Sequence, residues 1–540
     1  MTFSGLPFSS VPFSSLAVGG PVTPNPFVTL LDSAAAQRCF LADIDAYDVG
    51  GAALATLRMG SQGYTSQPTD TPASTYWHSH LAQPIDFARR IDHRDGLGGI
   101  ARIDGETEII NIDGTWDSLL DNYAIDGRRI LVRMGRPGDP LTNFGHVLVA
   151  FGLDVEGSRD SVRVRIDDGL ARLDKPVQVA AYAGTGALEG GADLKGKYRP
   201  LAFGQVLNVP AVLVDSVKLI YQVHAGAVDD IPAVYDRGVA LVRGTDYASQ
   251  SDLTTTAPTA GQYRVWPDGG YYRLGGTPAG TVTADVQGDA AGGYVETTAD
   301  VVQRILMAQA GFTTADINFA AFAQTNADAP AAVGIWIGTD AVRTIDIVDA
   351  LARGIGAFAG FTRYGVFALG VVTAPSGGGA ADFTDENIVT IERLLLPAAL
   401  APVVWRVSVG YQRNYTVQAD LAASVSVARR AFAAEEYRLA TAEDATVKTA
   451  HLLARELVRV DGYFATQVDA EDEADRLLAL FKERRGLYRL VTKMQALRLE
   501  LGDVVSIDTS RFGFAGGRLA RVVGYRLDTA RAEIELTLYA

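Results

Sequence analysis

The chain has 540 residues, of which 48% are hydrophobic, 9% aromatic and 21% charged. At about 150 residues per domain, this length predicts three or four domains, and the composition is that of a globular protein rather than a disordered one. The 63 acidic side chains outnumber the 48 basic ones, so the formal net charge at pH 7 is −15. Such an acidic surface argues against sequence-independent binding of nucleic acid, which needs clustered cations.

Cys39 is the only cysteine, so one chain cannot form an intrachain disulfide, a thiolate zinc site or a cysteine-held iron–sulfur cluster. No apolar stretch reaches the roughly 20 residues of a transmembrane helix; the densest, 394–405, is broken by Pro397 and Pro402. No basic residue precedes Arg38, which is atypical of a signal peptide. We therefore expect a soluble protein without stable membrane insertion and without a cofactor.

Residues 1–27 carry no charged side chain and contain the short repeat LPFSS, VPFSS at 6–15. Prolines at this spacing resist helix and central strand, which predicts an extended N-terminal arm. On a free arm Phe3, Phe8 and Phe13 would be unprotected from water. Two interpretations stand side by side: a flexible terminus, or an arm docked on a neighbouring subunit.

Residues 28–180 are predicted to form a first β-barrel-like domain. Short apolar runs are separated by turn residues, among them the Asp-Gly pairs at 104–105, 113–114 and 126–127. Asp-Gly supplies the positive φ that tight hairpins need, and many short strands at this spacing indicate a sandwich or barrel. The strand-like runs are Phe27–Leu31, Ile109–Ile112, Arg129–Val132, Val147–Phe151 and Ser161–Ile166.

Residues 181–290 begin with a glycine-rich linker, 183–197, and continue as an inserted β-rich domain. Residues 291–400 are predicted to be α/β. There Thr297 can cap a helix at 299–310, a second helix covers 345–352, and a hairpin turns at 363–365.

Residues 401–540 are predicted to form a second β-barrel-like domain that contains one helix. Strand patterns cover 403–411, 504–507, 519–527 and 532–538, and Asp469 is the expected cap of the helix. The predicted fold class is therefore mainly β with α/β insertions: two β-barrel-like domains that bracket smaller peripheral domains.

No motif in the chain indicates catalysis. Residues 191–198 match G-x-x-x-x-G-K but place Tyr198 at the magnesium-binding position, and no strand-to-helix geometry surrounds them, so a structured linker is the better interpretation. His78 and His80 share a strand face and lie near Asp86 and Asp92 in sequence, which makes a metal site imaginable. A polar, aromatic-flanked surface strand explains the two histidines better.

Other candidate acids and bases have equally simple explanations. His93 lies beside carboxylates, yet no Gly-x-Ser-x-Gly elbow supplies a nucleophile. A glycosidase needs two carboxylates that converge in a cleft. The acidic pairs of this chain are better explained as solvated charge at strand ends and at a helix N-terminus. They are Asp167 and Asp168, Asp229 and Asp230, Glu435 and Glu436, and Glu471 to Asp475. We therefore expect no enzymatic activity, no catalytic residue and no metal site.

One long segment, 182–242, resembles a segment typical of tail proteins from long-tailed bacteriophages and prophages of proteobacteria. Its recurring pieces include Tyr182-Ala183-Gly184, Leu194-Lys195-Gly196-Lys197, Pro200-Leu201-Ala202-Phe203-Gly204 and Tyr235-Asp236-Arg237-Gly238-Val239. Further similar pieces lie at 63–65, 70–73 and 292–297, and the stretch from Leu501-Gly502-Asp503 to Phe512-Gly513 resembles the end of such a hub barrel.

The resemblance implies a baseplate hub at the tail tip, a virion structural protein that acts in host attachment and DNA ejection. Such hubs are homotrimers whose paired barrels make a pseudo-sixfold ring between the tail tube or distal tail protein and the tip or fibre proteins. The tape-measure protein and, transiently, DNA pass through the lumen. The implied localisation is the virion, with the host cytoplasm during assembly. The single Cys39 departs from hub relatives that hold an iron–sulfur cluster.

Two hypotheses follow from this expectation, and one alternative function competes with it. Part of the acidic excess faces the lumen, because carboxylates do not bind phosphates. Partner contacts involve Phe3, Phe8 and Phe13 of the arm, with Phe512 and Phe514 near the C-terminus. The alternative is a host-surface, carbohydrate-binding tail protein that stacks sugars on Trp266, Tyr271 and Tyr272, although 266–271 is more simply a hairpin.

Overall fold

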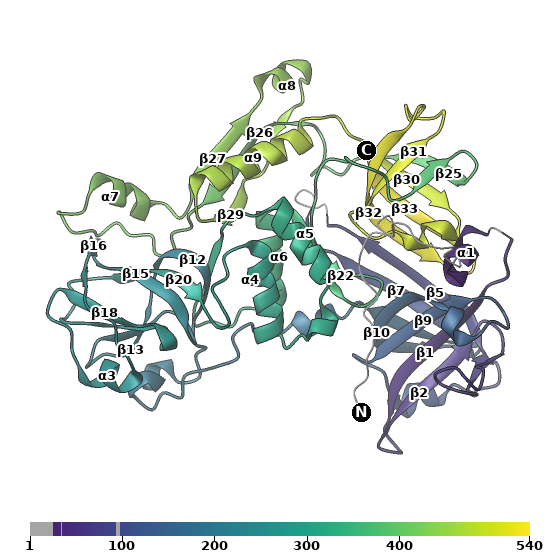
Figure 1. Cartoon of the computed structure of the whole chain (residues 1–540), viewed down its shortest axis with the longest axis horizontal. Coiled ribbons are helices and arrows are strands. Elements are labelled where there is room, and N and C mark those ends of the chain that lie inside the picture. The colour runs from purple at the N-terminus through teal and green to yellow at the C-terminus, as the bar shows by residue number, and fades with distance from the viewer. Residues whose placement is uncertain (1–24, 34, 93–97) are drawn as a thin grey trace, which may run out of the picture.

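The computed structural model describes residues 25–33, 35–92 and 98–540 (Figure 1). Its regular structure is mainly β, as the sequence predicts. One sheet has 16 strands and draws on both ends of the chain. The first part supplies β1 (Cys39–Asp48), β2 (Ala53–Gly60), β3 (Tyr64–Thr65), β4 (Tyr76–Ser79), β5 (Leu81–Arg90), β7 (Arg102–Ile110), β8 (Tyr123–Ala124), β9 (Arg129–Gly135), β10 (Gly145–Gly157) and β11 (Ser161–Asp167). The last part supplies β24 (Asp382–Thr384), β25 (Ile388–Leu394), β30 (Leu487–Thr492), β31 (Val504–Asp508), β32 (Arg518–Asp528) and β33 (Glu533–Tyr539).

The first ten of these strands form what we call the N-terminal unit. Its strands follow the order β5-β7-β11-β10-β9-β1-β2-β4, and His80 alone separates β4 from β5. β4, the last strand in this order, leads through one residue into β5, the first strand. The two ends of the series therefore lie close together, and the sheet curls round. The alternation in β11, where Val162, Val164 and Ile166 are buried and Arg163 and Arg165 are exposed, gives this curled sheet an apolar inside.

The last six strands form the C-terminal unit, in the order β25-β30-β33-β32-β31-β24. Its two edge strands, β24 and β25, are consecutive in the chain and are joined by residues 385–387. Among the described residues no ladder pairs β24 with β25, so the unit curls like a barrel without a hydrogen-bonded closure. Ile534, Leu536 and Leu538 of β33 lie on the buried face, as their spacing predicts.

The strands expected together after residue 401 lie in two sheets. The strands between residues 404 and 464 form a separate four-stranded sheet. The strands β24 and β25 come before residue 401, yet they pair with β31 and β30 of the C-terminal unit. Helix α9 (Gln467–Phe481) covers one face of the four-stranded sheet (Figure 1). The members of that sheet are β26 (Val404–Tyr411), β27 (Arg438–Glu443), β28 (Arg455–Glu456) and β29 (Val460–Phe464), with α7 (Val427–Ala434) and α8 (Ala445–Ala450) in the connections.

A two-sheet sandwich, at the left of Figure 1, forms most of the inserted β-rich part. The rings of Tyr221, Tyr263 and Tyr272 fill the space between its sheets. One sheet contains β12 (Leu201–Val209), β15 (Val228–Asp236), β16 (Val239–Ala240), β20 (Val282–Asp289) and β21 (Gly334–Ile337); the other contains β13 (Val212–Asp215), β14 (Ile220–Gln222), β17 (Val242–Arg243), β18 (Gln262–Trp266) and β19 (Tyr271–Leu274), with α3 (Gln250–Thr255) beside it.

The α/β stretch lies between the sandwich and the two β units (Figure 1). Thr297 caps α4 as predicted, and the second predicted helix is present as α6. The predicted hairpin is also present, and β6 of the N-terminal half adds to it in parallel. The elements are α4 (Thr298–Arg304), which continues as a π-helical turn at Ile305–Gln309, α5 (Phe319–Asp328), α6 (Thr344–Gly354), β22 (Ala357–Phe361), β23 (Phe367–Val371) and β6 (Gly99–Ile100).

Three local predictions are wrong. The run 27–31 lies in helix α1 (Pro26–Asp32), because Asn25 caps it and Pro26 has the fixed φ of a first helical residue. Asp104-Gly105 is no turn but lies inside β7, where a Cβ at Gly105 would lie 2.4 Å from the Asp86 carbonyl oxygen of β5. The cap of α9 is Thr466, three residues before Asp469.

The glycine-rich segment 183–197 is an ordered part of the fold, since Leu188 and Leu194 are buried with Tyr182 against the sandwich. Short 3-10 turns replace the strand and helix that a phosphate-binding loop needs. Within the described part of the chain, no helix combines the length and the apolar character that crossing a membrane requires.

Candidate assembly surfaces and internal junctions

The two β units are joined by one antiparallel ladder between β5 and β32. Its register runs from Arg90 opposite Gly524 to Asp86 opposite Asp528. At one end the Thr529 side chain caps the ladder: its hydroxyl donates to the Ile85 carbonyl at 2.6 Å and accepts from the Ile85 N–H at 2.9 Å. Residues more than 440 positions apart in sequence are thereby fixed in one sheet.

Side chains on both faces of this ladder reinforce it. On the outside, Arg526 donates to both carboxylate oxygens of Asp86, at 3.1 and 2.8 Å. On the inside, the rings of Phe87 and Tyr525 stack with centroids 5.8 Å apart. Burial raises the pKa of the Tyr525 hydroxyl well above its usual value, so this group stays protonated at physiological pH.

A buried ion cluster ties the α/β stretch to the same junction. Arg89 of β5 and Arg363 of the β22–β23 turn both reach the carboxylate of Glu500, which lies just before β31. Arg89 also donates to the carbonyl of Phe361 at 2.8 Å, and Arg363 to that of His146 at 2.7 Å. Burial, with Arg133 and Arg363 nearby, lowers the pKa of His146 to about 4, so the imidazole is neutral at pH 7.

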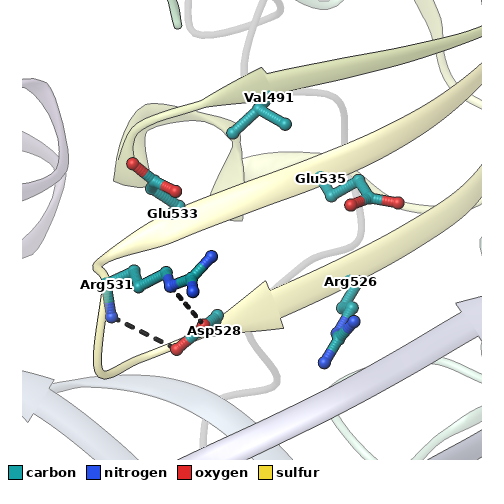
Figure 2. A pocket seen from close by; sticks show the side chains of 6 residues that line it. All are labelled: Val491, Arg526, Asp528, Arg531, Glu533 and Glu535. Carbon is teal, nitrogen blue, oxygen red and sulfur yellow. Dashed lines mark hydrogen bonds and ion pairs between the residues drawn. The ribbon is translucent and has the colours of Figure 1, made fainter. Parts of the chain in front are cut away.

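A shallow polar hollow of about 330 Å³ lies beside the β32–β33 hairpin (Figure 2). The charges around it are mostly paired: Arg531 with Asp528, Arg526 with Asp86, and Glu533 with Lys493. Its lining contains no hydroxyl, thiol or lysine nucleophile and no histidine, so it does not suit serine- or cysteine-type catalysis or histidine general-base chemistry. The lining residues are Val491, Arg526, Asp528, Arg531, Glu533 and Glu535.

The two predicted contact residues near the C-terminus have different environments. Phe514 is fully buried, with its ring 4.8 Å from that of Tyr488, so it belongs to the core of the C-terminal unit. Phe512 is 40% exposed at the surface of the same loop. Of this pair, only Phe512 can meet a partner. Phe3, Phe8 and Phe13 lie outside the described residues, and their docking stays a prediction.

The structure does not bring together the histidines and carboxylates of the imagined metal site. His78 and His80 stack, with ring centroids 5.9 Å apart, and both lie edge-on to Trp116. Asp86 and Asp92 are bound elsewhere, to Arg526 and Arg353. Throughout residues 25–33, 35–92 and 98–540 no three His, Cys, Asp or Glu side chains form a metal-binding group. His93 lies outside the described residues.

The acidic pairs are likewise separate from one another. Solvated charge does not explain Asp168 and Glu473, which are both buried. Glu473 pairs with Arg476, and Asp168 accepts hydrogen bonds from the Ile103 and Leu170 N–H groups, at 2.8 and 3.1 Å. Burial, with Asp167 beside it, raises the pKa of Asp168 to about 7. Asp230 pairs with Arg243 and Glu436 with Arg413, and Glu471 is exposed on α9. None of these acidic residues lines the hollow of Figure 2.

Sequence reasoning misses the Arg89–Arg363–Glu500 cluster, because its members lie far apart in sequence and no motif links them. It also misses the arginines that surround Phe512. For those a signal exists: Arg511 and Arg518 flank the glycine- and aromatic-rich run Phe512-Gly513-Phe514-Ala515-Gly516-Gly517. Arginines on both sides of an aromatic run can make cation–π contacts with its rings.

Comparison with known proteins finds only distant structural likeness. No family model matches the chain, and no curated protein matches it. The tail protein from Neisseria meningitidis MC58 has 9% sequence identity and a TM-score of 0.37, over 93% of this chain and 96% of that one. The 43 kDa tail protein of prophage MuSo2 from Shewanella oneidensis has 8% identity and a TM-score of 0.37, over 93% and 98%.

A chain of the virion of a native gene transfer agent particle has 16% identity and a TM-score of 0.38, over 64% of this chain and 84% of that one. Likeness at this level is too distant to assign a function to the present chain.

Proposed function

We propose that this protein is a structural component of a bacteriophage tail, the baseplate hub at the tail tip, and that three copies form a pseudo-sixfold ring. The observation that carries the proposal is the β5–β32 ladder, which holds two curled β units side by side in one chain. A trimer of two-unit chains offers six curled β units, alternately of the two kinds, around an axis. The resemblance of segment 182–242 to bacteriophage tail proteins is the reason for placing this ring in a phage tail.

In this role the ring joins the tail tube or distal tail protein to tip or fibre proteins. The tape-measure protein and DNA cross the ring, and part of the −15 charge faces that passage, so phosphates are repelled rather than bound. The protein acts in the virion after assembly in the host cytoplasm, and we assign it no catalytic step. The predicted arm, shortened to the residues before Asn25 because Pro26 and Phe27 belong to α1, docks on a neighbouring subunit or tail protein.

The carbohydrate-binding alternative is disfavoured by the side chains on which it depends. Tyr271 and Tyr272 are 4% and 0% exposed, and Trp266 is half-buried with its ring stacked on Tyr271, 5.8 Å between centroids. The segment 266–271 is a hairpin connection, as the sequence predicts. Rings that pack against each other in a core are not available to stack on sugars.

The test is the assembly state of the purified full-length chain. Mass photometry should give a species of three times the 57.4 kDa chain mass, and negative-stain images should show a ring with a central opening and six lobes. A protein that stays monomeric across salt and concentration, or that forms only compact particles without an opening, contradicts the proposal.

The arm has its own test. A variant that lacks residues 1–25 should lower the yield of complete tails, and tails at normal yield would contradict the docking of the arm.

A further inference from the structure

The C-terminal unit carries three exposed arginines that make no ion pair with any described residue. Arg393 lies on β25, and Arg511 and Arg518 lie at the two ends of the β31–β32 loop. Each guanidinium sits over a ring: Arg393 over Tyr488 at 6.0 Å, Arg511 over Phe512 at 5.8 Å and Arg518 over Phe514 at 5.8 Å. We call Arg393, Arg511, Arg518 and Phe512 the arginine patch. What distinguishes these three is that the rings beneath them are themselves in contact, Tyr488 with Phe512 at 6.0 Å and with Phe514 at 4.8 Å, so the cations form one surface.

The centre of the patch is a strained, exposed aromatic side chain. Phe512 has φ = 55° and is 40% exposed, although the left-handed region is costly for any residue with a Cβ. The buried ring of Phe514 and the ring of Tyr488 hold the loop in this conformation. The fold therefore maintains an apolar side chain at the surface, between cations, against both backbone preference and the hydrophobic effect.

The N-terminal unit carries a surface of opposite charge. After β7 the chain exposes Ile112, at 77%, and Leu120, at 45%, and places Asp113, Asp117 and Asp121 around them. These carboxylates form no ion pair with the described residues; Asp113 accepts from the Thr115 N–H at 3.1 Å and Asp117 from the Asn111 side-chain amide at 2.7 Å. We call these five residues, Ile112, Asp113, Asp117, Leu120 and Asp121, the acidic patch.

Both patches lie away from the β5–β32 ladder along the direction of the strands. The ladder uses residues 86–90 of β5 and 524–528 of β32, with Arg90 opposite Gly524, and Arg518 stands at the start of β32, before Gly524. The acidic patch follows the end of β7 where Ile109 pairs with Leu81, which is the other end of β5 from Arg90. The two patches therefore lie beyond opposite ends of the ladder.

We propose that the arginine patch of one copy binds the acidic patch of a second copy, so that the C-terminal unit of each subunit contacts the N-terminal unit of the next. Three cations meet three carboxylates, and Phe512 meets Ile112 and Leu120. A contact between two different surfaces is heterologous, and it closes into a ring when the rotation fits. This inference rests on the ring proposed above and names the contact that holds it together.

The first test reverses one patch. In the variant Arg393→Glu, Arg511→Glu, Arg518→Glu, like charges face each other, so the association constant for the trimer should fall by at least about tenfold. Raising the salt concentration should weaken the wild-type trimer in the same direction, because exposed charges are screened. Sedimentation velocity over a concentration series measures both effects, and unchanged circular dichroism establishes that the variant is folded.

A matched control separates the patch from net charge. The variant Arg136→Glu, Lys195→Glu, Lys197→Glu changes the net charge by the same amount at exposed cations without an ion pair among the described residues. It should associate like the wild type. The second test adds Asp113→Arg and Asp121→Arg to the reversed arginine patch, which restores opposite charges across the contact and should recover most of the lost association. Asp117 is left intact because it holds Asn111.

The outcomes distinguish this inference from the function on which it rests. If the wild type is trimeric and the reversed variant is equally trimeric, the patch contact is wrong and the ring stands. The patch contact is equally wrong if the control loses as much association as the reversed variant, or if the double reversal recovers none. If the wild type never associates, both the ring and the contact are wrong. The contact is supported if the reversed arginine patch loses association, if the added Asp113→Arg and Asp121→Arg changes recover it, and if the control variant associates like the wild type.

Discussion

Glu500 is the only carboxylate that Arg89 and Arg363 contact among the described residues. The two arginine side chains are 6% and 3% exposed, and Glu500 is 24% exposed. Each guanidinium has a backbone carbonyl as a further acceptor, yet carbonyls do not neutralise charge. The stability of the junction therefore depends on one acidic side chain that balances two buried cations.

Glu500→Gln should lower the free energy of unfolding by about 2 kcal/mol, somewhat below the cost of breaking a fully buried pair, because Glu500 retains contact with water. The variant leaves two arginines without a counter-charge while keeping the shape of the side chain. Urea denaturation followed by intrinsic fluorescence measures the change. Glu386→Gln is the control, since Glu386 is exposed and forms no ion pair with the described residues; equal midpoints for the two variants would contradict the account.

Asp168 should make stability pH-dependent. Its pKa is about 7 in the folded chain, raised by burial and by Asp167, against about 3.9 when unfolded. Between these values the folded chain holds a proton that the unfolded chain has lost, so stability is highest at the acidic end and falls as pH rises from about 4 to about 7. In Asp168→Asn this fall should be largely removed, as measured by melting temperatures across that range.

The comparison of variant with wild type is essential, because other groups titrate in the same window. Asp503, with a pKa raised to about 6 by burial, contributes with the same sign. Burial lowers the pKa values of His146 and His224 from 6.5 to about 4. Their contribution to the stability of the folded chain is therefore lost as pH falls from 6.5 to about 4, which is the opposite sign. Subtracting the variant profile isolates Asp168. A difference that stays constant from pH 4 to pH 7 would falsify the assignment.

At the scale of single elements, α9 shows how local signals position a helix. The Thr466 hydroxyl accepts from the Asp469 N–H at 3.2 Å and donates to the Asp469 carboxylate at 2.6 Å. Thr466→Ala should therefore cost about 1 kcal/mol of stability. Asp475→Ala, an exposed change in the middle of the same helix, should cost less than half as much. Both are measured by urea denaturation, and equal costs would argue against a specific cap.

The same helix illustrates what the sequence can predict. Local patterns predict the helix and its acidic start but place its cap three residues late, because Asp469 and Thr466 are both good caps and only the backbone distinguishes them. Strand β11 follows from alternation and β9 from a short continuous apolar run. Gly105 resembles a turn residue in sequence, since its real role, close approach of β7 to β5, depends on a strand that the local sequence does not reveal.

The surfaces are less predictable than the elements. The sequence singles out both Phe512 and Phe514, but one is exposed and the other is core, a distinction set by the β31–β32 loop and not by residue type. The grouping of strands into sheets depends on pairing partners that lie far apart in the chain, such as β5 with β32 and β25 with β30. Local periodicity carries no information about such partners.

At the scale of the whole molecule, one buried cluster runs through both β units and the α/β stretch and reaches β12 and β21 at one edge of the sandwich, whereas β15, β20 and the second sheet of the sandwich belong to other clusters. Leu527 of β32 is fully buried and lies opposite Phe87 of β5, in the ladder that joins the units. Because the two units share this sheet, we expect them to open together, as one cooperative structure, and independently of the sandwich.

Leu527→Ala should therefore raise hydrogen exchange in strands that are distant in sequence. Truncating a buried leucine to alanine lowers the free energy of unfolding by about 2–5 kcal/mol. The free energy of exchange should fall equally in β5 and β7 of the N-terminal unit and in β32 and β33 of the C-terminal unit. The sandwich strands β15 and β20 should keep wild-type protection. Val286→Ala, which truncates a fully buried side chain of the sandwich, should give the reverse pattern. Exchange mass spectrometry of both variants reads all these strands at once. If Leu527→Ala affects the C-terminal strands alone, the β5–β32 ladder does not couple the units, and the two would behave as separate domains.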